Sequence, residues 1–163
     1  MPPIFAAGAR EGLLKRLIYD YKYHQVRAMS QRLAEILDQT LPVIAGEVAI
    51  VPLPTIRRHI RERGFDHILL LAKKLARLRG YEVFKVLARN KNYVQVGADK
   101  AARELQASEA YKVTGAVDPD TTYLLLDDVW TTGSSMKAAI KKLQRAGALK
   151  IVGTVLAVSR LNH

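Results

Sequence analysis

A hydrophobic run that ends in two adjacent carboxylates and a turn of small residues is the stretch best suited to chemistry. Residues 123–135 read Tyr-Leu-Leu-Leu-Asp-Asp-Val-Trp-Thr-Thr-Gly-Ser-Ser. From Met136 onward, apolar residues recur at the three-and-four spacing of one helix face. The order of strand, acidic pair, small-residue turn and helix predicts a phosphate cradle at the carboxyl end of a parallel strand.

Different residue types in this stretch suit different parts of a ligand. Gly133 permits a backbone geometry in which successive amide N–H groups converge on one anion. Asp127 and Asp128 suit the hydroxyls of a sugar, or a magnesium ion shared with further phosphates. Hydroxyl donors come from the rest of the turn, namely Thr131, Thr132, Ser134 and Ser135. The alternative is an ordinary buried strand joined to a helix by a polar turn.

The same stretch resembles the signature of the type I phosphoribosyltransferases, which bind phosphoribosyl pyrophosphate (PRPP). That signature is a hydrophobic run, two acids, two variable positions, then Thr-Gly and small hydroxyl residues. A Walker loop is excluded because no Gly-Lys-Ser/Thr is present.

Length and composition predict one globular domain covering residues 1–163. No apolar run reaches the length of a membrane span, and Met1 to Arg10 lacks a secretory pattern, so we expect a cytoplasmic location with no membrane contact. The absence of cysteine excludes disulfides, thiolate zinc sites and cysteine nucleophiles. The net charge of +11 favours polyanionic partners such as nucleotides, PRPP or nucleic acid.

The remaining pattern predicts an α/β fold with a mostly parallel central sheet flanked by helices and a helical amino-terminal hood. Two helices are expected between Arg10 and Leu41, and Asp66 is expected to cap a third helix that ends near Gly80. The predicted strands span 48–53, 81–87, the run before the acids, and 150–159. The polar segment from Arg89 to Thr114 is expected to be a long functional or mobile connection.

Two basic segments are open to more than one interpretation. Four arginines follow the strand exit at Pro54-Thr55, in the run 57–63, where they are placed to bind an anion or to form a solvated helix face. In the hood, Lys22 and His24 are more simply solvent-facing, although a hood that contacts a ligand is the alternative. Trp130 is expected either to cover the sugar or to pack against a neighbouring loop.

Nearly the whole chain, from Phe5 to Arg160, also resembles one branch of that superfamily, the ComF (competence) family. Residues 22–25, 51–54 and 63–67 are similar to its Lys-Tyr-x-Gly, Val-Pro-x-Pro and Arg-Gly-Phe-Asn-Gln motifs. The chain lacks the glycine of the first motif, and Asp66 and His67 stand where the third has Asn and Gln. The cysteine-rich zinc module of longer members has no counterpart in this cysteine-free sequence.

The resemblance implies transfer of a phosphoribosyl group from PRPP to a nitrogen nucleophile, such as a nucleobase, with release of pyrophosphate. Asp127 and Asp128 would be the catalytic pair that holds the ribose, and Mg²⁺ would enter through PRPP, with those acids as candidate ligands. The 5′-phosphate would bind Thr131, Thr132, Gly133, Ser134 and Ser135. The pyrophosphate would face Thr55, Arg57 and Arg58, and a flexible loop carrying Gln95 and Arg103 would close over the site.

The ComF resemblance leaves two other functions open. One is an accessory in DNA uptake that binds single-stranded DNA or a competence helicase, and the other is a sensor that binds PRPP without turnover. Fold alone does not separate these functions. The acceptor and the oligomeric state are not fixed by the sequence, although dimers are usual in the superfamily and a homodimer is one expected arrangement.

Overall fold

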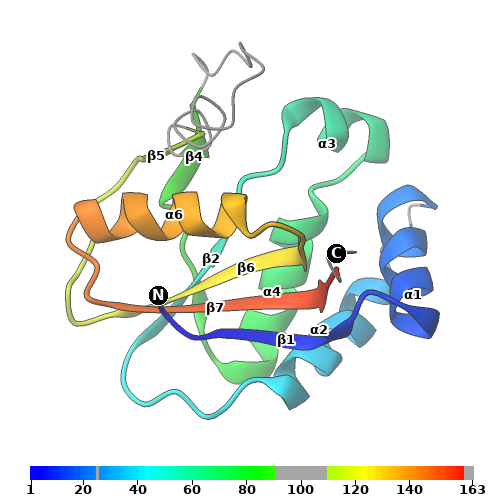
Figure 1. The fold of residues 1–163 in the computed structure, drawn as a ribbon, viewed down its shortest axis with the longest axis horizontal. Coiled ribbons are helices and arrows are strands. Elements are labelled where there is room, and N and C mark those ends of the chain that lie inside the picture. Colours follow the sequence, from blue (N-terminus) through cyan, green and yellow to red (C-terminus); the bar gives the residue numbers. More distant parts are fainter. Residues whose placement is uncertain (25, 91–109, 160–163) are drawn as a thin grey trace.

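A five-stranded parallel sheet forms the centre of the protein, as the sequence predicts (Figure 1). The structure is a computed structural model and describes residues 1–24, 26–90 and 110–159. The strand order is β1-β7-β6-β2-β3, and a separate antiparallel hairpin is formed by β4 and β5. Within the described ranges, no helix combines the length and apolar character needed to cross a membrane.

Helices connect most of the parallel strands, which is the arrangement that alternating strand and helix patterns indicate. The elements are β1 Ile4–Ala9, α1 Gly12–Tyr23, α2 Met29–Thr40, β2 Val48–Pro52, α3 Arg57–Arg63, α4 His67–Arg79, β3 Glu82–Val83, β4 Leu87–Arg89, β5 Tyr111–Val113, β6 Thr122–Trp130, α6 Ser134–Arg145 and β7 Lys150–Val158.

The neighbouring strands β2 and β6 form the switch point of the sheet. The chain leaves β2 through α3 and α4 toward β3 on one side, and leaves β6 through α6 toward β7 on the other. Ligands of open α/β sheets bind beyond the carboxyl ends of strands at such a point, because the two connections diverge there. Helices α1 and α3 stand at this end of the sheet (Figure 1).

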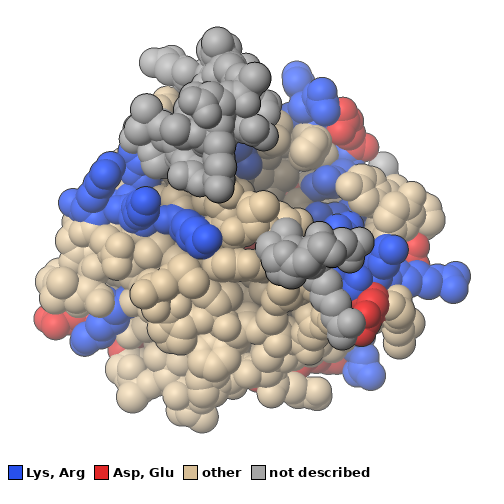
Figure 2. Space-filling view, in the orientation of Figure 1, with Lys and Arg blue, Asp and Glu red and all other residues tan. Residues whose placement is uncertain are grey.

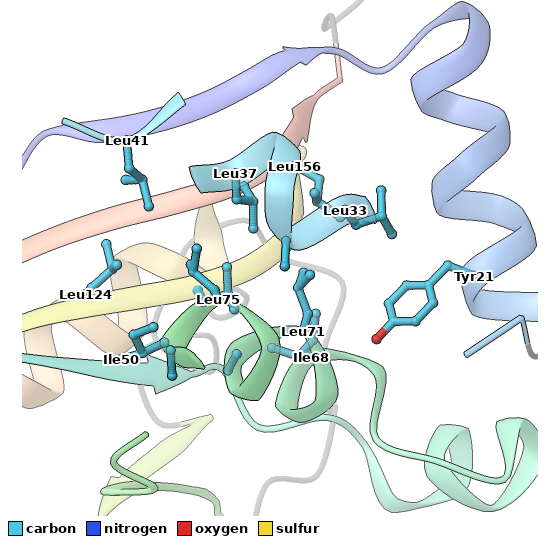
Figure 3. Close-up of a cluster of buried hydrophobic side chains, with 14 of the residues drawn as sticks. Tyr21, Leu33, Leu37, Leu41, Ile50, Ile68, Leu71, Leu75, Leu124 and Leu156 are labelled. Atoms are coloured by element: carbon cyan, nitrogen blue, oxygen red, sulfur yellow. The ribbon is translucent and has the colours of Figure 1, made fainter. Parts of the chain in front are cut away.

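Two hydrophobic clusters hold the layers together, one on each face of the sheet. Leu124 and Leu126 of β6 face the cluster formed with α1, α2 and α4, which Figure 3 shows in close-up. Tyr123 and Leu125 face the opposite cluster, which contains α6 and the β4–β5 hairpin. This alternation follows from the two-residue period of a strand, and it decides where the polar residues at the end of β6 point.

A buried tyrosine joins the amino-terminal hood to the rest of the fold. The Tyr21 hydroxyl donates a hydrogen bond of 2.6 Å to the backbone carbonyl of His67, at the start of α4. Asp66 caps that helix as predicted, because its side chain accepts a hydrogen bond from the backbone N–H of Leu69 at 3.1 Å. The hood and the amino end of α4 are therefore held together directly beside the carboxyl ends of the strands.

The structure differs from the sequence prediction at three places. The amino end is not wholly helical, because Ile4–Ala9 forms β1 and pairs with β7. The strand predicted at 81–87 is divided between β3 and β4, and β4 pairs with β5, which lies within the segment that was expected to be a long functional or mobile connection. Strand β6 extends through the acids to Trp130 rather than ending before them.

Candidate functional site

The paired acids at the end of β6 point to opposite faces of the sheet. Asp128 follows Leu124 and Leu126 toward α1 and α4, and Asp127 follows Leu125 toward α6. Adjacent carboxylates on a strand therefore meet different surroundings, although one peptide unit separates them.

Asp128 is tied to two helices by basic partners. Its Oδ2 atom forms an ion pair with the Lys22 ammonium group of α1 and lies 2.9 Å from Nε2 of His67 on α4. The Arg63 guanidinium, which can only donate, lies 3.0 Å from Nδ1 of His67. We infer that Nδ1 accepts this hydrogen bond, so that the His67 proton is on Nε2 and is donated to Asp128.

These surroundings separate the acidities of the two carboxyl groups. Burial alone would raise the pKa of Asp128, but the hydrogen bond from His67 and the positive charge of Lys22 hold that pKa well below its ordinary value. Burial and the neighbouring negative charge of Asp128 raise the pKa of Asp127 to about 7. One acid is therefore permanently charged at neutral pH, and the other titrates there.

Each acid keeps an oxygen for a ligand. Both cationic contacts of Asp128 are made to Oδ2, and Asp127 accepts a hydrogen bond from the Asp128 backbone N–H on Oδ1 at 2.9 Å. Within the described ranges, no hydrogen bond is recorded to Asp128 Oδ1 or Asp127 Oδ2. Two adjacent acceptor oxygens of this kind suit neighbouring hydroxyl groups.

A cavity of about 270 Å³ opens above the acids. Three basic side chains from different elements line it: Lys22 of α1, Arg63 of α3 and Arg89 of β4. Arg89 is fixed in place because its Nε donates to the Pro54 carbonyl at 3.0 Å and its guanidinium lies over the Tyr111 ring. In the same cavity wall, burial and the charge of Arg63 lower the pKa of His59. We call this cavity the acidic chamber, and its cations suit an anion bound next to the carboxylates.

The predicted phosphate turn, residues 131–135, encloses a second and smaller cavity of about 40 Å³. Gly133 adopts a left-handed backbone with φ of 74° directly before α6. The Ser134 N–H donates to the Thr132 hydroxyl oxygen at 3.3 Å, whereas the next N–H groups of the first turn, those of Ser135 and Met136, have no helical carbonyl to bind and can donate to an anion. Asp127 and Ser135 line both this cavity and the acidic chamber, and they join the two into one site.

Trp130 packs against the turn itself. A Cβ atom added to Gly133 would lie 2.2 Å from Cζ2 of the indole, so the ring occupies the space that a side chain would need. The ammonium of Lys137 lies over the same ring, 5.8 Å from its centroid. The ring therefore packs on the turn that follows it and also lines the small cavity, and covering of the sugar stays a prediction.

The structure brings only part of the arginine run to the chamber. Thr55 lines it, and its hydroxyl donates to Asp66 at 3.0 Å. His59 and Arg63, four residues apart on α3, face the cavity, whereas Arg57 and Arg58 lie on the exposed side of the helix. Arg58 pairs with Glu62 at 3.2 Å. These two arginines therefore do not line the chamber, because helical winding turns them away from it.

Sequence reasoning missed the basic residues that surround Asp128. Lys22 was expected in solvent, and this expectation was wrong, whereas His24 is exposed as expected and pairs with Asp20. The adjacency of Lys22 to an aromatic residue in a motif-like position was the signal that could have identified it. Gln95 and Arg103, predicted to close over the site, lie outside the described residues.

The contact between Gly133 and Trp130 predicts that Gly133→Ala is costly for two separable reasons. Gly80 offers a matched control, since it has a similar φ of 68° and open space around it. We expect Gly80→Ala to cost about 1 kcal/mol from backbone strain alone, and Gly133→Ala to cost a further 1–3 kcal/mol or so from overpacking. Urea unfolding measures both. Equal costs would contradict the packing of the indole on the turn.

The raised pKa of Asp127 predicts a pH-dependent stability. Between its ordinary value of 3.8 and about 7, the folded protein holds a proton that the unfolded chain has lost, so the free energy of unfolding falls as pH rises through this window. Asp127→Asn removes this penalty. We expect the variant to gain about 1–3 kcal/mol more over the wild type at pH 8 than at pH 5. Urea unfolding at both pH values measures the difference.

The same change at the exposed residue Asp120 is the control for this experiment. Asp120→Asn should shift stability by similar amounts at the two pH values. An Asp127→Asn effect that is also independent of pH would show that Asp127 does not retain its proton in the folded state.

Comparison with known proteins places this geometry within a known fold. No protein-family profile and no curated protein sequence matches the chain. Solved structures that are similar to it include a glutamine PRPP amidotransferase from B. subtilis complexed with ADP and GMP (17% identity, TM-score 0.58), and an allosteric regulatory enzyme of purine biosynthesis (17% identity, TM-score 0.59).

These structures match most of this chain but only a part of their own. The similarity covers 84% of this chain in both cases, and it covers 30% of the first and 29% of the second structure. The mostly parallel sheet and its flanking helices thus form a fold that these larger proteins also contain, the type I phosphoribosyltransferase fold.

Proposed function

We propose that the protein binds PRPP and transfers its phosphoribosyl group to a nitrogen nucleophile with release of pyrophosphate. The observation that carries the proposal is the position of Asp127. This carboxylate lines both the small cavity of the 131–135 turn and the cation-lined acidic chamber, at the switch point of the sheet. PRPP has the matching layout, because its ribose ring separates a 5′-phosphate from a pyrophosphate.

The two ends of PRPP would occupy the two cavities. The 5′-phosphate would accept hydrogen bonds from the amides and hydroxyls of the turn at the amino end of α6. The ribose hydroxyls would donate to the oxygens of Asp127 and Asp128 that have no hydrogen bond recorded within the described ranges. Positive charge develops on the ribose when the pyrophosphate leaves, and the ionised Asp128 would stabilise it.

The pyrophosphate would lie in the acidic chamber, near Thr55. Arg63 and Arg89 present their guanidinium groups there, so we propose that they perform the role that the sequence suggested for Arg57 and Arg58. The exposed Arg57 and Arg58 would guide an anion toward the entrance rather than hold it.

Magnesium fits this site as a companion of the pyrophosphate. Among the described residues, no group of three or more His, Cys, Asp or Glu side chains converges to hold a metal ion. Mg²⁺ is commonly bound by one or two carboxylates together with substrate phosphates, and Asp127 and Asp128 provide that number. When bound, the ion would supply charge neutralisation for the leaving pyrophosphate.

Pyrophosphate release measures the proposed reaction directly. We expect release from PRPP with Mg²⁺ and a suitable nucleobase, and a loss of at least about a hundredfold in the double variant Asp127→Asn, Asp128→Asn, since both ribose contacts and the transition-state charge are removed. Calorimetric titration with magnesium and PRPP reports binding separately from turnover.

A matched control removes two exposed acids at the turn before β6. Asp118→Asn with Asp120→Asn changes the net charge by the same amount, and it should leave both binding and release unchanged. Binding of PRPP without release in the presence of any nucleobase would favour a PRPP sensor. Absence of binding would contradict the proposal.

One surface favours a second function, the binding of single-stranded nucleic acid. Lys137, Lys141 and Arg145 are exposed on α6 at intervals of four residues, so they form one basic stripe along the helix. Figure 2 shows this row of positive side chains, separate from the group over α1 and α3. Such a stripe suits the backbone of a polyanion.

Removing the stripe tests this second function. The triple variant Lys137→Gln, Lys141→Gln, Arg145→Gln should weaken binding to a fluorescent oligothymidine and lower the slope of log affinity against log salt by about 2. Fluorescence anisotropy at several salt concentrations gives both quantities. The control is the same loss of charge on α3, through Arg57→Gln, Arg58→Gln and Arg61→Gln. Equal weakening by both variants would show that α6 is not a specific surface.

A further inference from the structure

A larger cavity lies on the other side of the segment that leaves β2. It has a volume of about 520 Å³, nearly twice that of the acidic chamber. Its walls come from the β2 exit, from α3, from the start of α4 and from the β4–β5 hairpin. We call it the hairpin cavity. The two cavities share a wall that includes Thr55 and Arg89, but Asp127 and Asp128 line only the acidic chamber of the two.

The floor of the hairpin cavity is apolar. It is formed by aliphatic residues of the four surrounding elements, which include Leu53, Ile60, Leu69 and Leu87. Ile56, at its edge, is a large apolar side chain that stays 40% exposed. An apolar surface of this kind gains free energy when a ligand removes it from water.

The rim of the same cavity is cationic. Arg57, Lys85 and Lys112 come from three separate parts of the fold, and all three are exposed. Within the described ranges, none of these three side chains forms an ion pair with a carboxylate. The lining also contains one carboxylate, Asp66, whose Oδ1 accepts hydrogen bonds from the Thr55 hydroxyl and the Leu69 N–H, so the cations of the cavity outnumber its acids.

We propose that the hairpin cavity is a second ligand site, specific for a small amphipathic organic anion. The ligand would lay a flat or aliphatic body on the apolar floor and direct two or more negative groups to the rim. The volume falls within the range of roughly 300–1,000 Å³ that is usual for small-ligand pockets, which favours a small molecule over a macromolecular partner. The three cations favour a ligand with several charges over one with a single charge.

This inference does not depend on the proposed phosphoribosyl transfer, since the two cavities present different chemistry. The acidic chamber places the carboxylates of Asp127 and Asp128 among its cations, whereas the hairpin cavity combines an apolar floor with a rim that has more positive than negative groups. A ligand of the hairpin cavity therefore needs neither a sugar nor magnesium.

Naphthalene sulfonates test the site, because the ring matches the floor and the sulfonates match the rim. In calorimetric titrations we expect naphthalene-1,5-disulfonate to bind at one site, at least fivefold more tightly than naphthalene-1-sulfonate. The double variant Lys85→Gln, Lys112→Gln should weaken binding of the disulfonate at least fivefold. Both lysines are exposed, so the variant retains its fold.

A matched control removes two exposed charges elsewhere, through Lys15→Gln and Arg16→Gln on α1. It should leave the affinity for the disulfonate unchanged. Equal weakening in both variants would show general attraction to a basic protein and would overturn the proposal. Another cavity, of about 310 Å³, lies between the amino terminus and α6 and is lined by Lys141. Loss of binding on Lys141→Gln would place the probe there and would also overturn the proposal.

Sedimentation velocity completes the test by asking what covers the cavity. The proposal expects the same sedimentation coefficient for the wild type and for the Lys85→Gln, Lys112→Gln variant. If the wild type self-associates, if disulfonate binding disappears as it does so, and if the variant is monomeric, the occupant is a second copy of the chain and the proposal fails.

Discussion

The buried contact of Asp128 with Lys22 and His67 is the interaction on which the site depends. A carboxylate at the end of a central strand would be unstable in this position without partners, because burial disfavours its charged form. Lys22 and His67 supply those partners from α1 and α4, and Arg63 orients His67 from α3. Helices α1 and α4 thereby meet at Oδ2 of Asp128, and Arg63 links α3 to this contact through His67.

This arrangement has a direct electrostatic consequence for the neighbouring acid. Because Asp128 remains ionised, its negative charge adds to the effect of burial on Asp127, and the pKa of Asp127 rises to about 7. Lys22 and His67 make their close contacts with Asp128, and the charge of Lys22 offsets only part of the rise in the pKa of Asp127. A single pair of identical residues therefore provides one fixed charge and one group that responds to pH near neutrality.

The sequence was sufficient to predict the sheet and the turn, because both depend on local patterns. The run before Asp127, the glycine at 133 and the apolar period after Met136 are each visible within a few residues. Strand β1 and the β4–β5 hairpin were missed because they are short and are defined by partners far away in sequence. The role of Lys22 was missed because its carboxylate partner lies more than a hundred residues later, and the local motif around Lys22 does not name that partner.

The arginine run shows how local and distant information combine. Its composition indicated an anion site, but composition does not say which side chains face inward. Because 57–63 forms a helix, residues four positions apart lie on the same side of it. His59 and Arg63 therefore both face the acidic chamber, whereas Arg57 faces the hairpin cavity. The segment between β2 and α3 thus separates two cationic surfaces. One adjoins carboxylates and the other adjoins aliphatic side chains, so under the two proposals the basic residues would bind a sugar phosphate on one side and an amphipathic organic anion on the other.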